Sequence, residues 1–113
     1  MTAWGISKTV LGLAVLGVLG LAVPSVRAQE TGKSLFTAKC AMCHGADATG
    51  KTPMGQALKI PDLHSDAVQK LSDAELTEIV TKGKNKMPAY ESKLSKEEIG
   101  KLVEFVREMG KKH

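Results

Sequence analysis

The chain has 113 residues, of which 16 are basic and 12 acidic, and it contains only one Trp, one Tyr and two Phe. The small positive charge is spread along the sequence, which is not the composition of a nucleic-acid-binding protein, so we expect no nucleic-acid partner. A chain this short with so few large apolar side chains would have a thin protein core, which suggests that a non-protein group occupies its centre.

The first 28 residues are predicted to be a secretory signal peptide that is cleaved after Ala28. Lys8 precedes an uncharged apolar run from Val10 to Val23, and small residues stand before the expected cleavage site. The run is too short to cross a bilayer comfortably, so we favour cleavage over an uncleaved anchor and expect no stable membrane insertion afterwards. Residues 29–113 would then form one exported domain.

Residues 31–43 are predicted to begin the domain with a short amphipathic helix. Leu35, Phe36 and Ala38 give it an apolar face. Gly32 stands in the first turn, where glycine is conformationally costly unless another element approaches closely. We therefore expect a second helix to cross at Gly32 and to contact Phe36. The alternative is that Gly32 belongs to a flexible tail.

Cys40 and Cys43 are the only cysteines, and with His44 they form a C-x-x-C-H run. The two thiols can add to the vinyl groups of a haem as thioethers, and the imidazole can bind the iron. A disulfide of a thiol oxidoreductase would need alternating strands and helices around it, and a zinc site would need a fourth ligand. The run therefore predicts one haem c, attached through both cysteines and bound at the iron by His44.

Residues 45–61 are rich in glycine and proline and are predicted to form a loop around one face of the haem. A short helix is expected to follow. It would cover Ala67, Val68 and Leu71.

Two capping boxes predict the remaining helices. In residues 72–75 and again in residues 95–98, a serine is followed three positions later by a glutamate, which is a pattern that begins helices. Gly83 and Gly110 are expected to end these helices. Apolar residues recur at helical spacing after each box and give each helix one buried face. They are Leu76, Ile79, Val80, Ile99, Leu102, Val103 and Val106.

The loop from Lys84 to Leu94 carries Met87 immediately before Pro88. A residue before proline is held in an extended conformation, which projects its side chain away from the local backbone. Iron in a low-spin electron carrier takes six ligands, so His44 needs a partner on the opposite face of the ring. Met87 is the favoured sixth ligand because its loop, its distance along the chain from His44 and its rigid neighbour all suit the role.

Four other side chains are weaker candidates for the sixth position. Met54 is close in sequence to His44 and would have to round the haem edge on a short tether. His64 is more typical of a surface histidine or of one beside a haem propionate. Met42 lies inside the attachment run, and Met109 lies on the apolar face of the last helix. An iron without a second protein ligand is the remaining alternative.

Three segments taken together resemble a small class I c-type cytochrome, closest to the c6 and c553 type. They are residues 40–45, 83–90 and 94–99. The resemblance spans essentially all of residues 29–113 and implies an all-α class I cytochrome c fold, with about four short helices wrapped around one covalently attached haem. It also implies that the first and last helices cross at a glycine-aromatic contact. The residues that match this contact are Gly32, Phe36, Leu102 and Phe105.

The resemblance implies roles for individual residues as well. The family's attachment thiols match Cys40 and Cys43, and its iron ligands match His44 and Met87. Many members fix the tautomer of the ligand histidine through a proline carbonyl in a Gly-Pro-x-Leu run. The matching run in this chain, residues 55–58, contains no proline.

These features predict a single-haem electron carrier and not an enzyme. A thioether donor favours ferrous iron, and two fixed ligands leave no open position for a substrate. We expect a monomer in the periplasm, or in the thylakoid lumen of a photosynthetic cell. It would move single electrons between a quinol-oxidising membrane complex and an oxidase or another acceptor. The alternatives are a peroxidase or gas-binding haem protein with a labile sixth ligand, and a haem-free thiol-redox or metal-binding module.

Docking of the redox partners is expected at the exposed haem edge. Lysines near this edge would steer an acidic partner. They are Lys39, Lys51, Lys84 and Lys86. An ordinary solvated surface is nevertheless the favoured interpretation of these lysines, because scattered charges seldom carry specific binding energy.

Overall fold

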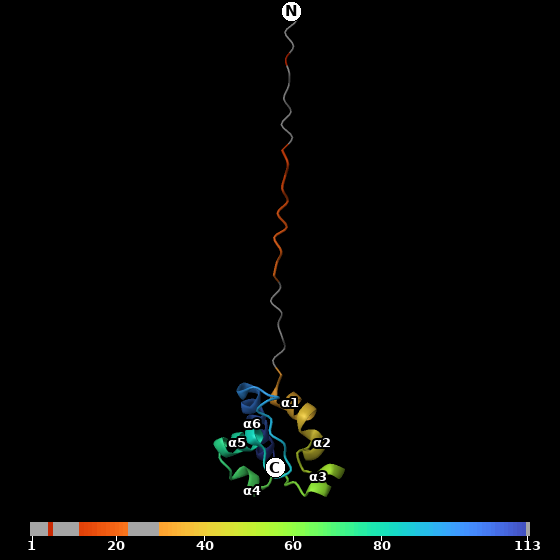
Figure 1. Ribbon diagram of the computed structural model, residues 1–113, viewed down its shortest axis with the longest axis vertical. Helices are drawn as coiled ribbons and strands as arrows, with labels where there is room; N and C mark the ends of the chain where they lie inside the picture. The colour runs from red at the N-terminus through yellow and green to blue at the C-terminus, as the bar shows by residue number, and fades with distance from the viewer. Residues whose placement is uncertain (1–4, 6–11, 23–29, 113) are drawn as a thin grey trace, which may run out of the picture.

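The computed structural model describes residue 5 and residues 12–22 and 30–112. Within these residues the chain is helical, and the one pairing of extended backbone is an isolated bridge between Lys84 and Met87. The all-α prediction is therefore confirmed, with six helices in the described part instead of about four (Figure 1). They are α1 (Gly32–Lys39), α2 (Ala41–His44), α3 (Pro53–Leu58), α4 (Asp66–Gln69), α5 (Asp73–Lys82) and α6 (Lys96–Lys111).

The apolar run near the N-terminus is described over residues 12–22, where it is exposed and outside any helix. The expected cleavage site at Ala28 lies outside the described residues. Among the helices that the structure describes, none is both long enough and apolar enough to cross a bilayer.

The helix predicted over residues 31–43 is broken at Cys40 into α1 and α2. Thr31 begins α1, with its side-chain oxygen accepting from the N–H of Ser34. Cys40 ends α1 with φ −119°, outside the usual helical range, while its own N–H still donates to the carbonyl of Phe36. The carbonyl of Cys40 then accepts from the N–H groups of Cys43 and His44 at 3.2 Å and 2.9 Å, which starts the new turn.

The prediction of a loop throughout residues 45–61 is wrong over Pro53–Leu58, which form α3. Thr52 begins this helix, and its Oγ1 accepts from the N–H of Gly55 at 2.9 Å. Pro53 occupies the first turn, where the missing N–H of proline costs nothing because that N–H has no intrahelical partner. Pro53 is therefore the start of a helix and not part of a loop.

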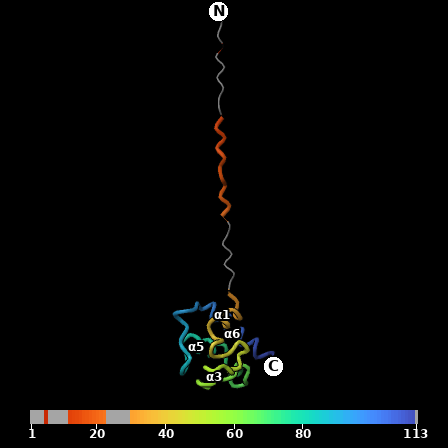
Figure 2. The backbone as a smooth tube through the Cα atoms, turned by 90° about the vertical axis from the view of Figure 1, so that its right-hand side faces the viewer, coloured from red at the N-terminus to blue at the C-terminus, as the bar shows by residue number. Residues whose placement is uncertain are grey.

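Helices α1 and α6 cross at Gly32, which confirms the predicted packing role of this glycine (Figures 1 and 2). A Cβ at position 32 would lie 2.3 Å from the carbonyl oxygen of Lys101 and 3.0 Å from Cβ of Phe105. One turn further along α1, the ring of Phe36 lies against that of Phe105, with their centroids 5.2 Å apart. The glycine allows the two backbones to approach, and the aromatic pair fills the contact beside it.

Both capping boxes form as predicted, at Ser72 with Glu75 and at Ser95 with Glu98. Gly83 ends α5 with φ 78°, a conformation that favours glycine.

The expectation that Gly110 ends the last helix is wrong, because α6 continues through it to Lys111. Position 110 has no room for a side chain, because a Cβ there would lie within 2.6 Å of three side-chain atoms of Gln69. The glycine is therefore a packing position inside the helix and not a stop signal.

The core lies where α1, α5 and α6 meet, and its centre is aliphatic and aromatic. Leu35 is the large side chain that is most completely enclosed, at 1% exposure. Met109 packs against this core from α6, in agreement with its predicted structural role. The buried members are Leu35, Phe36, Ala48, Leu63, Val68, Leu76, Leu94, Ile99, Leu102, Val103 and Phe105.

Candidate haem site

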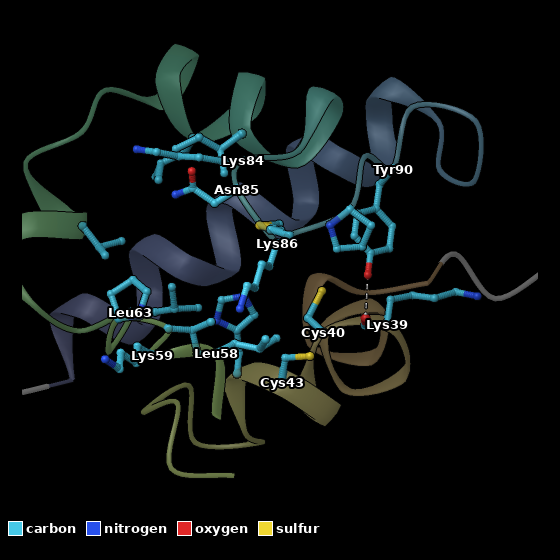
Figure 3. A pocket seen from close by; sticks show the side chains of 18 of the residues that line it. Lys39, Cys40, Cys43, Leu58, Lys59, Leu63, Lys84, Asn85, Lys86 and Tyr90 are labelled. Atoms are coloured by element: carbon cyan, nitrogen blue, oxygen red, sulfur yellow. Dashed lines mark hydrogen bonds between the residues drawn. The ribbon is translucent and has the colours of Figure 1, made fainter. Parts of the chain in front are cut away.

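A cavity of about 440 Å³ opens between the α1–α2 region and the segment that follows α5 (Figure 3). Its walls are mostly aliphatic and come from segments spread over fifty residues of sequence. The apolar lining residues are Leu58, Ile60, Pro61, Leu63, Val68, Leu71, Leu76, Ile79 and Pro88. A large flat apolar group would bury its faces against such walls.

Both cysteines line one side of this cavity, and Figure 3 shows their side chains next to each other. The break between α1 and α2 places Cys40 at the junction and Cys43 one turn later. Both thiols are free. Burial, together with the neighbouring Cys43 thiol, raises the pKa of Cys40 to about 11, so this thiol is protonated at neutral pH.

His44 lines the same cavity from the end of α2. Burial lowers the pKa of its imidazole, which favours the neutral form that binds metals. Its Nδ1 is buried and has no hydrogen-bond partner among the described residues. The proline-free run at residues 55–58 therefore supplies no acceptor for this atom in the structure.

The backbone around His44 is nevertheless closely held by the residues that follow. Thr52 Oγ1 donates to the carbonyl of Cys43 at 2.8 Å, and the carbonyl of His44 accepts from the N–H of Gly50 at 2.7 Å. A Cβ on Gly55 would stand 2.5 Å from the Cys43 carbonyl oxygen. Helix α3 is thus pressed against the turn that carries Cys43 and His44, and it fixes the direction of their side chains.

Met87 lines the cavity together with His44 and the two cysteines. It is held in a tight turn, in which the N–H groups of Lys84 and Met87 donate to each other's carbonyls at 3.1 Å and 2.9 Å. Asn85 provides the left-handed residue of this turn, with φ 54°. A Cβ on Gly83 would lie 2.5 Å from the carbonyl oxygen of Met87, so the turn also needs glycine at its base.

The other candidates for the sixth position do not line the cavity. Met42 and Met54 are exposed, at 80% and 46%. His64 Nδ1 lies 2.6 Å from Oδ1 of Asp62. Within the described residues, Met87 is thus the methionine that shares the cavity with His44.

Four lysines and no carboxylate line the cavity. They are Lys39, Lys59, Lys84 and Lys86. Figure 3 shows Lys84 across the cavity from the cysteines. Lys51, the other lysine named from the sequence, is exposed but does not line the cavity.

Sequence reasoning did not assign Tyr90, Leu63 or Leu71 to a haem pocket. Tyr90 lines the cavity, and its Oη donates to the carbonyl of Lys39 at 3.0 Å. Leu63 and Leu71 also contribute, although neither belongs to a recognised motif. Of these three residues, only Tyr90 could have been recognised as a pocket residue from the sequence. It is the single tyrosine of the chain, and it ends the Met-Pro-Ala-Tyr segment that contains Met87.

Comparison with known proteins identifies the family. The sequence model of the cbb3-type cytochrome c oxidase subunit III family matches residues 27–106. Cytochrome c6 of Bryopsis maxima is 35% identical over 77 residues, which cover 68% of this chain and 86% of that protein. The chain belongs to the c-type cytochromes. A cytochrome c6-like protein of Nostoc sp. is 31% identical over 99 residues, which cover 86% of each chain.

A solved structure of a c-type cytochrome is also similar to this chain. The solved structure of the KustC0563 c-type cytochrome has a TM-score of 0.66 and 30% sequence identity, and the match covers 71% of this chain and 98% of that one. The cbb3-type cytochrome c oxidase subunit FixPc of Rhizobium leguminosarum bv. viciae is 36% identical over 84 residues. This match covers 72% of the cytochrome but only 28% of the relative, so the chain spans little more than a quarter of the FixPc length.

As a c-type cytochrome, the chain carries haem c. The residues around the cavity fit such a group. Two thiols stand together on an apolar wall, an imidazole is kept neutral by burial, and the surrounding side chains are aliphatic. Lysines at the cavity can also offset the negative charge of haem propionates.

Proposed function

We propose that the cytochrome is an exported, monomeric carrier of single electrons. In this proposal Cys40 and Cys43 would hold one haem c by thioethers, and His44 and Met87 would be the protein ligands of its iron. The observation that carries the proposal is the shared cavity of these four side chains, which come from segments more than forty residues apart. When bound, the haem supplies a one-electron redox centre.

The protein's own residues perform the remaining tasks in this mechanism. The Lys84–Met87 turn holds the thioether in one place in both oxidation states, which keeps rearrangement small. The apolar walls exclude water, and this exclusion together with the soft thioether ligand raises the reduction potential above that of a bis-histidine haem. His44 and Met87 would together leave no ligand position for a substrate, so we propose a carrier and not an enzyme.

The axial ligands are tested by spectroscopy of protein matured in a host with haem-attachment machinery. We expect sharp reduced bands in the visible range and a weak near-infrared sulfur-to-iron band in the oxidised protein. Met87→Ala should abolish the sulfur-to-iron band, whereas the matched control Met54→Ala should retain it. A band that survives in Met87→Ala and disappears in Met54→Ala would transfer the ligand role to Met54.

We further propose that the partners are membrane redox complexes, a quinol-oxidising donor and an oxidase or other acceptor. The four lysines of the cavity, without a neighbouring carboxylate in its lining, favour an acidic docking surface on the partner. The relationship to cbb3-type oxidase subunits is in keeping with an acceptor of the oxidase class.

Charge reversal tests this docking. At low ionic strength, Lys84→Glu and Lys86→Glu should slow the bimolecular electron transfer to an acidic partner, and added salt should remove the difference. Lys51→Glu is the matched control, because Lys51 is exposed but does not line the cavity. Equal slowing in all three variants would show that only net charge matters.

We propose that residues 1–28 act as the signal for export to the periplasm, or to the thylakoid lumen in a photosynthetic host, and are removed after Ala28. The intact mass of the exported haem protein tests this directly. It should equal residues 29–113 plus one haem. A mass that includes residues 1–28 would instead support a retained anchor.

A further inference from the structure

Tyr90 connects the two segments that carry the proposed haem-binding groups. Its Oη donates to the carbonyl of Lys39 at 3.0 Å, across 51 positions of sequence (Figure 3). Lys39 stands immediately before Cys40, and Tyr90 follows Met87 by three positions. The hydrogen bond therefore links one wall of the cavity to the other.

The main chain of Tyr90 is fixed independently of this bond. Its N–H donates to the carbonyl of Val80 in α5 at 3.0 Å. Its carbonyl accepts from the N–H groups of Lys93 and Leu94, each at 2.9 Å. The ring lies partly buried against the core, and Nζ of Lys93 lies 5.6 Å from its centroid. The phenol thus reaches Lys39 from a rigid base.

The acceptor is suited to this bond. Lys39 is the last residue of α1, and carbonyls at a helix end lack the N–H partner that the next turn would provide. Among the hydrogen bonds of the described residues, the other bonds of residues 83–95 stay within that segment or reach α5 and α6. The Tyr90 phenol is the bond by which this segment reaches the α1–α2 wall.

We propose that Tyr90 is a positioning residue that holds the Met87 segment against the α1–α2 wall, and so keeps the Met87 thioether in place on the haem iron. This inference rests on the proposed ligation by Met87. Without the phenol oxygen, the Met87 segment keeps its hydrogen bonds to α5 but loses its hydrogen bond to Lys39, which lies next to Cys40. Met87 then leaves the iron more often, and an external ligand gains access.

Tyr90→Phe tests this in the haem-loaded protein, because it removes one oxygen atom and keeps the ring. In the oxidised protein we expect the apparent association constant for cyanide to rise by about two- to tenfold, the range for loss of one hydrogen bond. The near-infrared sulfur-to-iron band should weaken in parallel. Thr37→Val is the matched control. It removes a hydroxyl of α1 that donates to the carbonyl of Lys33 at 2.9 Å, away from the cavity.

The wild-type spectrum separates the two proposals. If the wild-type protein lacks the sulfur-to-iron band, the ligation by Met87 fails, and the role of Tyr90 fails with it. If the band is present but Tyr90→Phe binds cyanide like the wild type, only the role of Tyr90 is overturned. A rise in Tyr90→Phe that is matched in Thr37→Val would also overturn it, because a general loss of stability would then explain both.

Discussion

Gly110 lies directly against the side-chain amide of Gln69, so closely that a Cβ at position 110 would stand 2.3 Å from Gln69 Cδ. The same amide donates from Nε2 to the carbonyls of Leu63 and Val106, at 2.7 Å and 3.1 Å. Leu63 lines the haem cavity, and Val106 belongs to α6. The amide of Gln69 thus joins the cavity wall to the last helix and has little freedom to move.

Gly110→Ala should therefore destabilise the protein. The new methyl group would displace the Gln69 amide from its two acceptors, and we expect a net loss of about 1–2 kcal/mol after allowing for the better helix propensity of alanine. Gly100→Ala in the same helix is the control, because a Cβ there meets nothing within 4 Å. It should stabilise by up to about 1 kcal/mol. Denaturant unfolding of the haem-loaded protein measures both, and the same sign in both variants would contradict the argument.

Gly32→Ala should cost more than Gly110→Ala. The obstacle at Gly32 is the main-chain carbonyl of Lys101, which a side-chain rotation cannot remove, so α1 and α6 would have to separate. Such overpacking typically costs about 1–3 kcal/mol, and we expect the upper part of this range. The midpoint of thermal unfolding should fall clearly below that of Gly100→Ala. An unchanged midpoint would show that the two helices adjust without loss.

Arg107 should stabilise the protein more through the several hydrogen bonds of its guanidinium group than through its positive charge. It donates from Nε to Asp73 Oδ1 at 2.8 Å, from Nη1 to the carbonyl of Gln69 at 2.8 Å, and from Nη2 to the carbonyl of Leu71. Arg107→Lys keeps the charge but cannot reach all three acceptors, and we expect a loss of about 1–3 kcal/mol.

Asp73→Asn provides the comparison for Arg107→Lys. The Asp73 side chain is 75% exposed, so its ion pair with Arg107 should contribute less than about 1 kcal/mol, and added salt should weaken that contribution further. Denaturant unfolding at two salt concentrations separates these contributions. If Asp73→Asn costs as much as Arg107→Lys, the charge and not the contact with the carbonyls accounts for the stabilisation.

Part of the acid sensitivity should come from Glu75. A hydrogen bond from the N–H of Ser72 lowers the pKa of this carboxyl, so the folded protein binds its proton less readily than the unfolded chain. The resulting stabilisation is present above the ordinary pKa of 4.5 and is lost as the pH falls through the lowered folded-state value. Glu75→Gln preserves the cap but removes this titration, so unfolding midpoints measured from pH 7 down to acid should fall less steeply.

Local patterns predicted the elements whose causes are local. The two capping boxes depend on residues three positions apart, and both formed as the sequence indicated. Gly83 likewise ends α5 through its own backbone conformation. The prediction at Pro53 was wrong because proline is common both in loops and in the first turn of a helix. Here the side chain of Thr52 accepts a hydrogen bond from the N–H of Gly55 and so begins a helix.

Local sequence patterns could not predict the role of residues whose partners lie far away in the sequence. Gly110 has the sequence signature of a helix end, but its purpose is set by Gln69, which is 41 positions away. The cavity walls at Leu63 and Leu71, and the bond from Tyr90 to Lys39, likewise arise only when separate segments meet. The C-x-x-C-H run and the Met-Pro pair were recognisable because the chemistry of haem attachment and ligation demands particular residue types at particular spacings.

The crossing of α1 over α6 also shapes the surface beside it. Glu30, before α1, and Lys112, after α6, border the same surface groove, although they are more than eighty positions apart in the sequence. The match to FixPc occupies 28% of that subunit, so a segment similar to this one also occurs within a longer polypeptide.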